Sequence, residues 1–152
     1  MNYWLMKSEP EAFSIDDLKR VKVEPWDGVR NFQARNMLRD EMAKGDLAFF
    51  YHSNCQNPGI VGIMEIARSG YPDPTAFDPE ALHYDPQSNP DNPRWYLVDV
   101  RYRCHLNRII TLQELKEYAE EELHGLPLLR RGNRLSVLPV TEQQWEFILS
   151  LE

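Results

Sequence analysis

Two neighbouring apolar segments constrain the fold of this chain more than any other feature. They are LAFFYH (residues 47–52) and GIVGIMEIA (residues 59–67), and only a short turn separates them. A strand that is apolar on both faces belongs in the middle of a sheet. The two segments therefore predict adjacent, buried central strands.

Three other segments have strand character. Residues 2–6 place Tyr3 and Leu5 on one face and Trp4 and Met6 on the other, and LSVLPV (135–140) is a late strand. The segment WYLVDVRYRCH (95–105) alternates between apolar and polar residues, which is typical of a half-buried strand. Its alternation predicts four inward side chains, namely Val98, Val100, Tyr102 and Cys104.

Four helices are predicted from residues that cap a helix N-terminus by accepting a backbone hydrogen bond. These capping residues are Ser14, Asn31, Thr111 and Thr141. The helix after Asn31 should end at residues 44–46, and the helix after Thr111 near Glu122. Strands and helices do not alternate regularly, which favours an α+β fold with a curved or closed sheet.

Length and proline content define the overall organisation. The chain has 152 residues, enough for one domain with a real core. Residues 70–93 hold six of the eleven prolines. Such a segment predicts a long ordered loop on the domain rather than regular structure.

Composition excludes several classes of function. No apolar run approaches about 20 residues, and the N-terminus NYWLM is too short and aromatic for a signal peptide. We therefore expect a cytoplasmic protein without a membrane partner, and we favour a monomer. Cys55, Cys104 and the four histidines lack ligand spacing, and no phosphate-binding glycine motif occurs, so we expect no metal and no cofactor.

Charge is distributed unevenly along the chain. The net charge of −7 argues against a protein that coats DNA by neutralising its phosphates. The segment LLRRGNRL (128–135) nevertheless carries Arg130, Arg131 and Arg134 with no acid. This cluster lies on a Gly-Asn turn, where it is suited to local phosphate contacts.

The segment WDGVRNFQARN (26–36) raises the question of whether Trp26 fills the core or lines a cavity. Asp27, Arg30 and Asn31 are polar, and Gly28 lets the backbone approach closely. A flat heteroaromatic guest would gain ~1–3 kcal/mol by stacking on the indole. Core filling is the competing interpretation.

Two more clusters of polar and aromatic residues follow predicted strands, in LMKSEP (5–10) and FYHSN (50–54). The alternative for LMKSEP is an ordinary exposed strand end, and the alternative for FYHSN is a histidine whose role is structural. We expect them to form one pocket with Trp26. The predicted base-binding residues are Trp26, Ser8, Asn31, Tyr51, His52 and Ser53, and the predicted phosphate-binding residues are Lys7, Arg30, Arg130 and Arg134.

Six segments together resemble the EVE-domain family. They occur in family order from Tyr3 to about Val140 and read YWLMKSEP, WDGVRNFQARN, GDLAFFYHS, GIVGIMEIA, NPRWYLVDV and LLRRGNRLSVLPV. The resemblance implies a PUA-like fold, which is a small curved β-barrel surrounded by helices, and a single EVE domain over residues 1–152. It also implies a module that recognises a flipped, modified base of cytosine or adenine type in DNA or RNA.

EVE domains are related to YTH domains, which hold a methylated adenine in an aromatic cage. Lys7-Ser8 and Trp26 stand where the YTH pattern has a Lys-Ser pair and a cage tryptophan. The segment FYHSN has no tryptophan where YTH domains usually place a second one. We therefore expect one stacking wall rather than a full cage.

Two other functions compete with a reader of modified bases. Related ASCH domains include hydrolases of modified nucleosides, and here Lys7 and Glu9 could act as base and acid. No Ser-His-Asp, Cys-His or paired-carboxylate arrangement is readable, so we expect a non-catalytic reader without catalytic residues. The third alternative is an adaptor whose acidic helix 111–122 docks on a partner.

Overall fold

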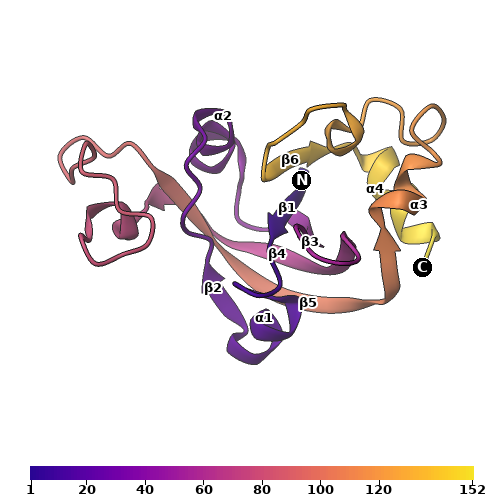
Figure 1. The fold of residues 1–152 in the computed structure, drawn as a ribbon, viewed down its shortest axis with the longest axis horizontal. Helices are drawn as coiled ribbons and strands as arrows, with labels where there is room; N and C mark the ends of the chain where they lie inside the picture. The colour runs from indigo at the N-terminus through magenta and orange to yellow at the C-terminus, as the bar shows by residue number, and fades with distance from the viewer.

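Six strands form one mixed sheet in the computed structural model, which describes all residues from 1 to 152 (Figure 1). The strands are β1 (Tyr3–Ser8), β2 (Val23–Pro25), β3 (Leu47–His52), β4 (Gly59–Pro72), β5 (Tyr96–Thr111) and β6 (Val137–Val140). Their order is β2-β5-β4-β3-β1-β6, and only β1 and β3 pair in parallel. The two apolar segments therefore are the central strands β3 and β4, as predicted.

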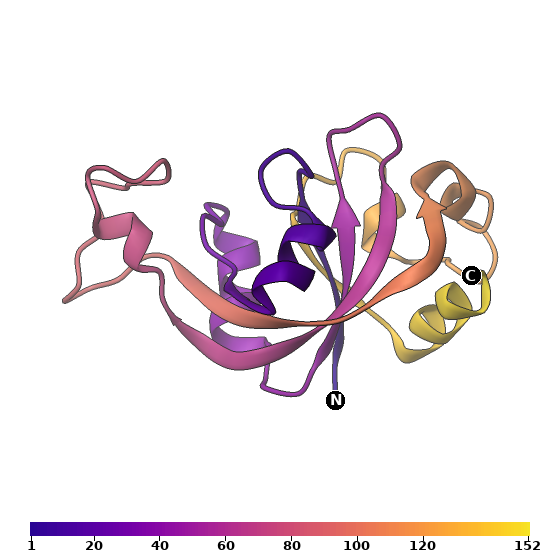
Figure 2. The same ribbon diagram turned by 90° about the horizontal axis from the view of Figure 1, so that it is seen from below.

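The sheet is strongly curved but open. Figure 2 shows the long strands β4 and β5 sweeping together around one side of the molecule. Hydrogen bonding ends at β2 and β6, which each pair with a single neighbour. The expected α+β class is confirmed, whereas closure of the sheet into a barrel is not shown.

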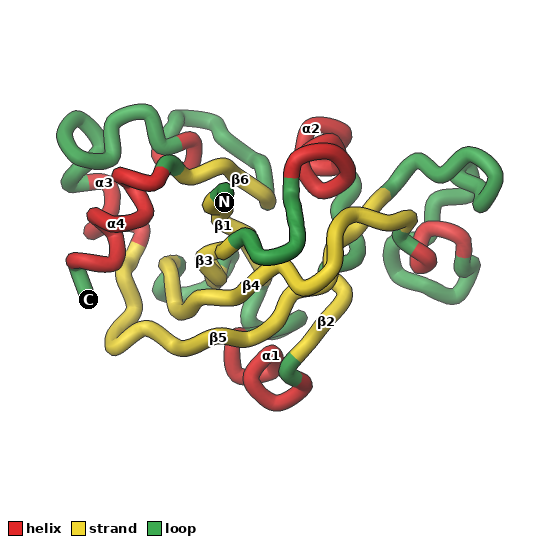
Figure 3. The backbone as a smooth tube through the Cα atoms, turned by 180° about the vertical axis from the view of Figure 1, so that it is seen from behind, coloured by secondary structure: helices red, strands yellow, loops and turns green.

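Short helices cover both faces of the sheet (Figure 3). The helical segments are α1 (Ile15–Val21), α2 (Phe32–Asn36), the π-helical turn η1 (Met37–Glu41), the 3₁₀ turns η2 (Pro74–Phe77) and η3 (Pro127–Leu129), α3 (Leu112–Lys116) and α4 (Glu142–Ser150). All four predicted capping residues accept the expected backbone hydrogen bond. None of these helices has the length and apolar character needed to cross a membrane.

The alternation of side chains along β3 explains why this strand is apolar throughout. Ala48 and Phe50 point into one core, which α1 and α2 cover. Phe49 and Tyr51 point into a second core on the opposite face, which α3 and α4 cover. Every inner residue of this strand is therefore shielded from water, and the burial of both faces stabilises the centre of the sheet.

Four side chains of β5 were predicted to point into the core, and this prediction is wrong for one of them. Cys104 is exposed, although Val98 and Val100 are buried and Tyr102 is half-buried. The pairing register shifts at this point, since Ile63 pairs with Cys104 while Met64 pairs with Tyr102. Such a bulge inserts one extra residue and reverses the alternation beyond it.

The helix after Thr111 is shorter than predicted. It ends at Lys116 rather than near Glu122, and the chain continues in turns to Gly125. Glu117 and Glu121 would stand four apart on a longer helix, where like charges repel. The helical segment after Asn31 also ends early, at Glu41.

The proline-rich segment forms a long excursion between β4 and β5. Strand β4 runs to Pro72, slightly beyond the predicted boundary at residue 70, and β5 begins at Tyr96. Between them only η2 is regular, and the loop projects from one end of the sheet beside α2 (Figure 1). The long loop was predicted correctly, and it supplies part of the site described next.

Candidate functional site

Trp26 occupies the position where the chain leaves β2. Its backbone N–H donates to the carbonyl of Val98 on β5 at 2.8 Å, which fixes the start of the loop. Its indole meets the rings of Phe50 and Phe13 edge-on, with centroid distances of 5.4 and 6.5 Å. The side chain is only 7% exposed, so most of the indole belongs to the core.

A hollow of about 300 Å³ nevertheless opens beside this indole, and we call it the Trp26 cavity. Its lining consists of Lys7, Ser8, Ala12, Phe13, Glu24, Pro25, Trp26, Asp27 and His83. The indole N–H of Trp26 has no hydrogen-bond partner in the protein. Every fully buried side-chain nitrogen or oxygen of this protein does have such a partner. The Trp26 N–H is therefore not fully buried and can be reached from the cavity. Most of the indole ring fills the core, and the remaining part lines the cavity.

Four residues with ionisable side chains, Lys7, Glu24, Asp27 and His83, line the Trp26 cavity. The side chains of Glu24, Asp27 and His83 form no hydrogen bond or ion pair with another residue, although His83 and Arg30 attract the Asp27 carboxylate. The Lys7 ammonium lies 5.8 Å from the centre of the Tyr51 ring. Lys7 and Glu24 are half-buried, whereas Asp27 and His83 are exposed at the mouth of the cavity. Unused donors and acceptors around an aromatic wall are the arrangement that a small polar ligand requires.

Desolvation moves the pKa values of Lys7, Glu24 and Asp27 toward the neutral forms. Burial lowers the pKa of Lys7. Burial, followed by repulsion from Asp73, raises the pKa of Asp27, and burial with repulsion from Asp27 raises the pKa of Glu24. An opposite charge or a hydrogen-bond donor on a ligand would stabilise the ionised carboxylates.

Ser8 is held in place by the protein. Its hydroxyl donates to the carbonyl of Phe13 at 2.6 Å, and its own carbonyl accepts from the N–H of Ser53. Both Ser8 and Phe13 line the cavity. The predicted pairing of Ser8 with Trp26 in one hollow is therefore present in the structure.

The proline-rich loop provides one wall of the cavity through His83. Gly28 has a φ of +81°, and a Cβ atom there would lie 2.6 Å from the His83 ring. The backbone can follow this path only without a side chain, because both the conformation and the close contact disfavour one. Gly28 thus permits His83 to reach the hollow.

Arg30 fastens this loop. Its guanidinium donates twice to the carbonyl of His83, at 3.0 and 2.7 Å, and forms an ion pair of 3.0 Å with Asp73. It also lies 5.5 Å from the centre of the Trp95 ring. The structure therefore uses Arg30 as an internal clamp, and its donors are largely occupied rather than free for a phosphate.

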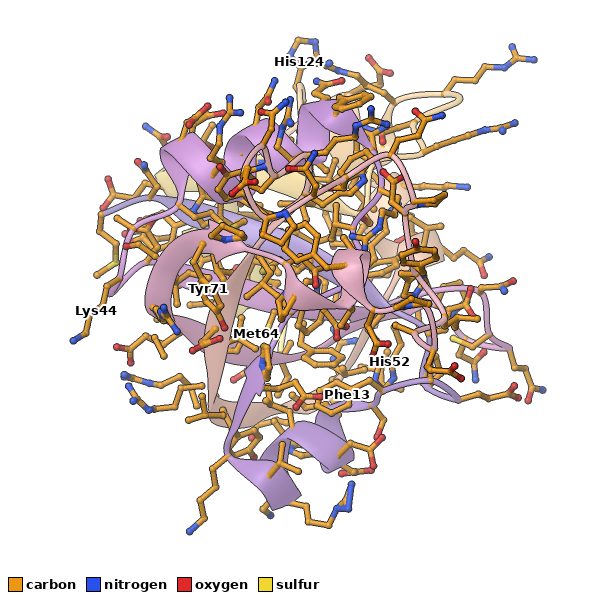
Figure 4. All side chains as sticks on the ribbon, turned by 90° about the vertical axis from the view of Figure 1, so that its left-hand side faces the viewer. Phe13, Lys44, His52, Met64, Tyr71 and His124 are labelled. Atoms are coloured by element: carbon orange, nitrogen blue, oxygen red, sulfur yellow. The ribbon has the colours of Figure 1, made fainter.

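Three other predicted base-binding residues lie outside the cavity lining. The Tyr51 ring is buried in the second core, on the face opposite to Trp26, and burial raises the pKa of its phenol to about 12. His52 packs edge-on against Phe50, and its Nε2 accepts from the N–H of Ile15. Figure 4 labels His52 and Phe13, which contact the same Phe50 ring from different segments. Ser53 contributes its backbone N–H to Ser8.

The remaining predicted residues meet at a second hollow of about 360 Å³. Asn31 caps α2 there, and the turn 130–135 forms the other side. Arg130 and Arg134 are exposed and have no acidic partner within ion-pair distance. The N–H of Lys7 donates to the carbonyl of Ser136 at 2.8 Å, which connects the arginine turn to the Trp26 cavity.

Several cavity residues were not among the predicted site residues. Asp27 was recognisable as a polar neighbour of Trp26, whereas Phe13 and Glu24 carried no local signal. His83 reaches the cavity from a loop more than fifty positions along the chain. Only long-range contacts of His83, with Gly28 and with the Arg30 guanidinium, reveal this wall.

Comparison with known proteins gives consistent matches over the whole length. Residues 2–151 match the sequence profile described as the EVE domain. Mouse thymocyte nuclear protein 1 is 50% identical over an alignment of 167 positions, gaps included. The alignment covers 99% of this chain and 74% of that protein.

Solved structures give the same result. A Pseudomonas syringae protein has a TM-score of 0.94 at 49% identity, with 98% of each chain covered. Human THYN1 protein, crystallised in complex with DNA containing 5-methylcytosine, has a TM-score of 0.91 at 47% identity, with 99% of this chain and 97% of that chain covered. A mutant ASCH protein from Zymomonas mobilis, at 14% identity and a TM-score of 0.58, shares the fold alone.

Proposed function

The chain belongs to the EVE-domain family, and on that basis we propose that it binds DNA carrying a modified base and holds this base in the Trp26 cavity. The observation that carries the proposal is the cavity beside the Trp26 indole, where the indole N–H is free and the Glu24 and Asp27 carboxylates bond to no other residue. The human relative crystallised with 5-methylcytosine DNA favours DNA over RNA as the partner. We further propose that residues 1–152 act as one such domain.

The size of the cavity suits one flipped base. Small-molecule sites usually have volumes of about 300–1,000 Å³, and this cavity lies at the lower limit. A single planar ring fits such a volume better than a longer ligand. Flipping costs a few kcal/mol in duplex DNA, which stacking against the exposed part of the indole and edge contacts would offset.

The two carboxylates favour a base with an exocyclic amino group. Asp and Glu side chains accept hydrogen bonds from the N4 amino group of cytosine, and adenine has an equivalent N6 amino group. Thymine and guanine present a carbonyl oxygen at those positions, which a carboxylate repels. Asp27 and Glu24 thus support a ligand of cytosine or adenine type.

Asp27→Asn is expected to weaken binding of a duplex with one 5-methylcytosine by about tenfold at neutral pH, since a good base-edge pair is worth ~1–3 kcal/mol. Wild-type affinity should rise with pH as Asp27, whose pKa is raised in the free protein, becomes ionised. Fluorescence anisotropy from about pH 4, near the ordinary pKa of an aspartate, up to about pH 7 measures both effects, and the profile of Asp27→Asn should be flatter.

The fold provides an internal control for this variant. Because the folded-state pKa of Asp27 is raised, ionisation of Asp27 opposes folding as pH rises through that value. Asp27→Asn should therefore unfold no more easily than the wild type at neutral pH. Unchanged affinity and an unchanged pH profile would show that Asp27 does not read the base.

We propose that Lys7, Arg130 and Arg134 contact phosphates around the flipped base, with Asn31 beside them. Arg130→Gln/Arg134→Gln should weaken binding of modified and plain duplexes alike. The slope of log affinity against log salt should decrease by roughly two, about 0.9 for each lost phosphate contact. Lys116→Gln, an exposed change on α3, serves as the control, and an unchanged slope in the double variant would contradict this role.

Hydrolysis of a modified nucleoside is the second candidate function, because the same cavity holds an amine of lowered pKa and two carboxyls of raised pKa. Glu9, the acid expected to assist Lys7, is exposed and bonds to Asn54 instead of lining the cavity. Mass spectrometry of modified nucleosides after incubation with the protein distinguishes the two functions.

The cytoplasmic location remains a prediction, since the name of the vertebrate relatives refers to the nucleus.

A further inference from the structure

Leu82 directly precedes His83, a lining residue of the Trp26 cavity, and its side chain is in solvent. It is 92% exposed, more than any other large apolar residue of the chain. Single exposed leucines are ordinary on protein surfaces and carry no argument by themselves. The position of Leu82 is different, because the next residue, His83, forms a wall of the cavity.

The protein holds this leucine on a fixed turn. The carbonyl of His83 receives two hydrogen bonds from Arg30, and the N–H of Tyr84 donates to the carbonyl of Ala81. The N–H of Asp85 donates to the carbonyl of Ala76, which closes the loop at its base. The backbone on both sides of Leu82 is thus held by hydrogen bonds, while the Leu82 side chain points into solvent.

The exposure of Leu82 has no explanation within the fold. By contrast, Phe32, another exposed large apolar residue in this region, stacks on Trp95 at a centroid distance of 4.7 Å and lies under the guanidinium of Arg35. Leu82 belongs to neither of the two hydrophobic cores. Its apolar surface is therefore available to a partner that occupies the cavity.

We propose that Leu82 enters the base stack of duplex DNA at the gap that the flipped base leaves. This inference rests on the proposed function and adds a preference for duplex over single-stranded DNA. Removing a base from a duplex exposes the apolar faces of its neighbours, and proteins that distort DNA insert leucine and similar side chains between such faces. A leucine adjacent to the wall of the base cavity is placed for this purpose.

The test compares Leu82→Ala with the wild type on two DNA ligands. One is a duplex with a single 5-methylcytosine, and the other is the same modified strand alone. Leu82→Ala should bind the duplex about tenfold more weakly and the single strand with unchanged affinity, because only the duplex has a gap to fill. Ile109→Ala, a change at an exposed apolar residue on β5, is the matched control and should affect neither ligand.

A third ligand sharpens the comparison. A mismatch opposite the modified base lowers the cost of flipping, so the loss caused by Leu82→Ala should become smaller. Equal affinities of Leu82→Ala and wild type for the duplex, or equal losses on duplex and single strand, would overturn the role of Leu82 alone. A wild type that binds modified and plain DNA equally in both forms would refute the proposed function and this inference with it.

Discussion

Trp26→Ala should lose discrimination between modified and plain DNA by about tenfold to a hundredfold, because base stacking on an aromatic side chain is worth ~1–3 kcal/mol. The same change should lower the free energy of unfolding by about 3 kcal/mol or more, as expected for a buried tryptophan. Its indole is 7% exposed and contacts Phe13 and Phe50. Both effects follow from one ring that belongs to the core and to the cavity.

Two further variants separate binding from stability. Trp26→Phe keeps an aromatic ring and should retain more of both properties than Trp26→Ala. Trp145→Ala removes a tryptophan that is equally buried in the second core, stacked on Phe49 at 3.8 Å. It should destabilise the fold while the folded fraction still discriminates between modified and plain DNA. A similar loss of discrimination in Trp145→Ala would contradict a specific role for Trp26.

Asp73→Ala is expected to cost about 3–5 kcal/mol of unfolding free energy, the range for removing one partner of a buried ion pair. The Asp73 side chain is fully buried and accepts hydrogen bonds from Gly28, Arg30 and Thr75. Its loss would leave these donors without their acceptor and release the loop that carries His83 and Leu82. Urea unfolding measures the cost, and binding of modified DNA should weaken as well.

The same residue predicts an acid dependence of stability. Burial alone would raise the pKa of Asp73, but hydrogen bonds from Thr75, Gly28 and Arg30 outweigh it and lower the pKa. Stability from Asp73 is therefore present above its unfolded-state pKa and is lost as pH falls through the lower folded-state value. Asp91→Ala, at an exposed position of the same loop, should leave stability unchanged at every pH. If Asp73→Ala behaved in the same way, Asp73 would not be the anchor of this loop.

Local sequence patterns predicted the elements of the fold well. Apolar residues on both faces identified β3 and β4, and Ser14, Asn31 and Thr111 were recognised as helix caps because capping depends on neighbours only three residues away. Cys104 was misplaced because a bulge depends on how two strands pair. Nothing in the sequence of β5 alone shows where its register against β4 shifts.

The candidate site was only partly predictable for the same reason. Lys7, Ser8 and Trp26 lie at element ends that local patterns indicate, and all three line one cavity. The alternation along β3 already separates Phe50 from Tyr51, so Tyr51 could have been assigned to the opposite face. His83 could not be found this way, because only the folded loop brings it to Gly28.

The central claim is that a modified base lies against the Trp26 indole, and the free indole N–H offers a direct measurement. The chain has four tryptophans, and the indole N–H groups of Trp4 and Trp95 donate to Asp46 and Asp85 within the protein. In ¹H–¹⁵N NMR spectra, Trp26→Phe identifies the Trp26 indole signal by its disappearance. Titration with a 5-methylcytosine duplex should shift this signal strongly, and the same duplex with plain cytosine should shift it little. A Trp26 signal that stays in place while the modified duplex binds would contradict the claim.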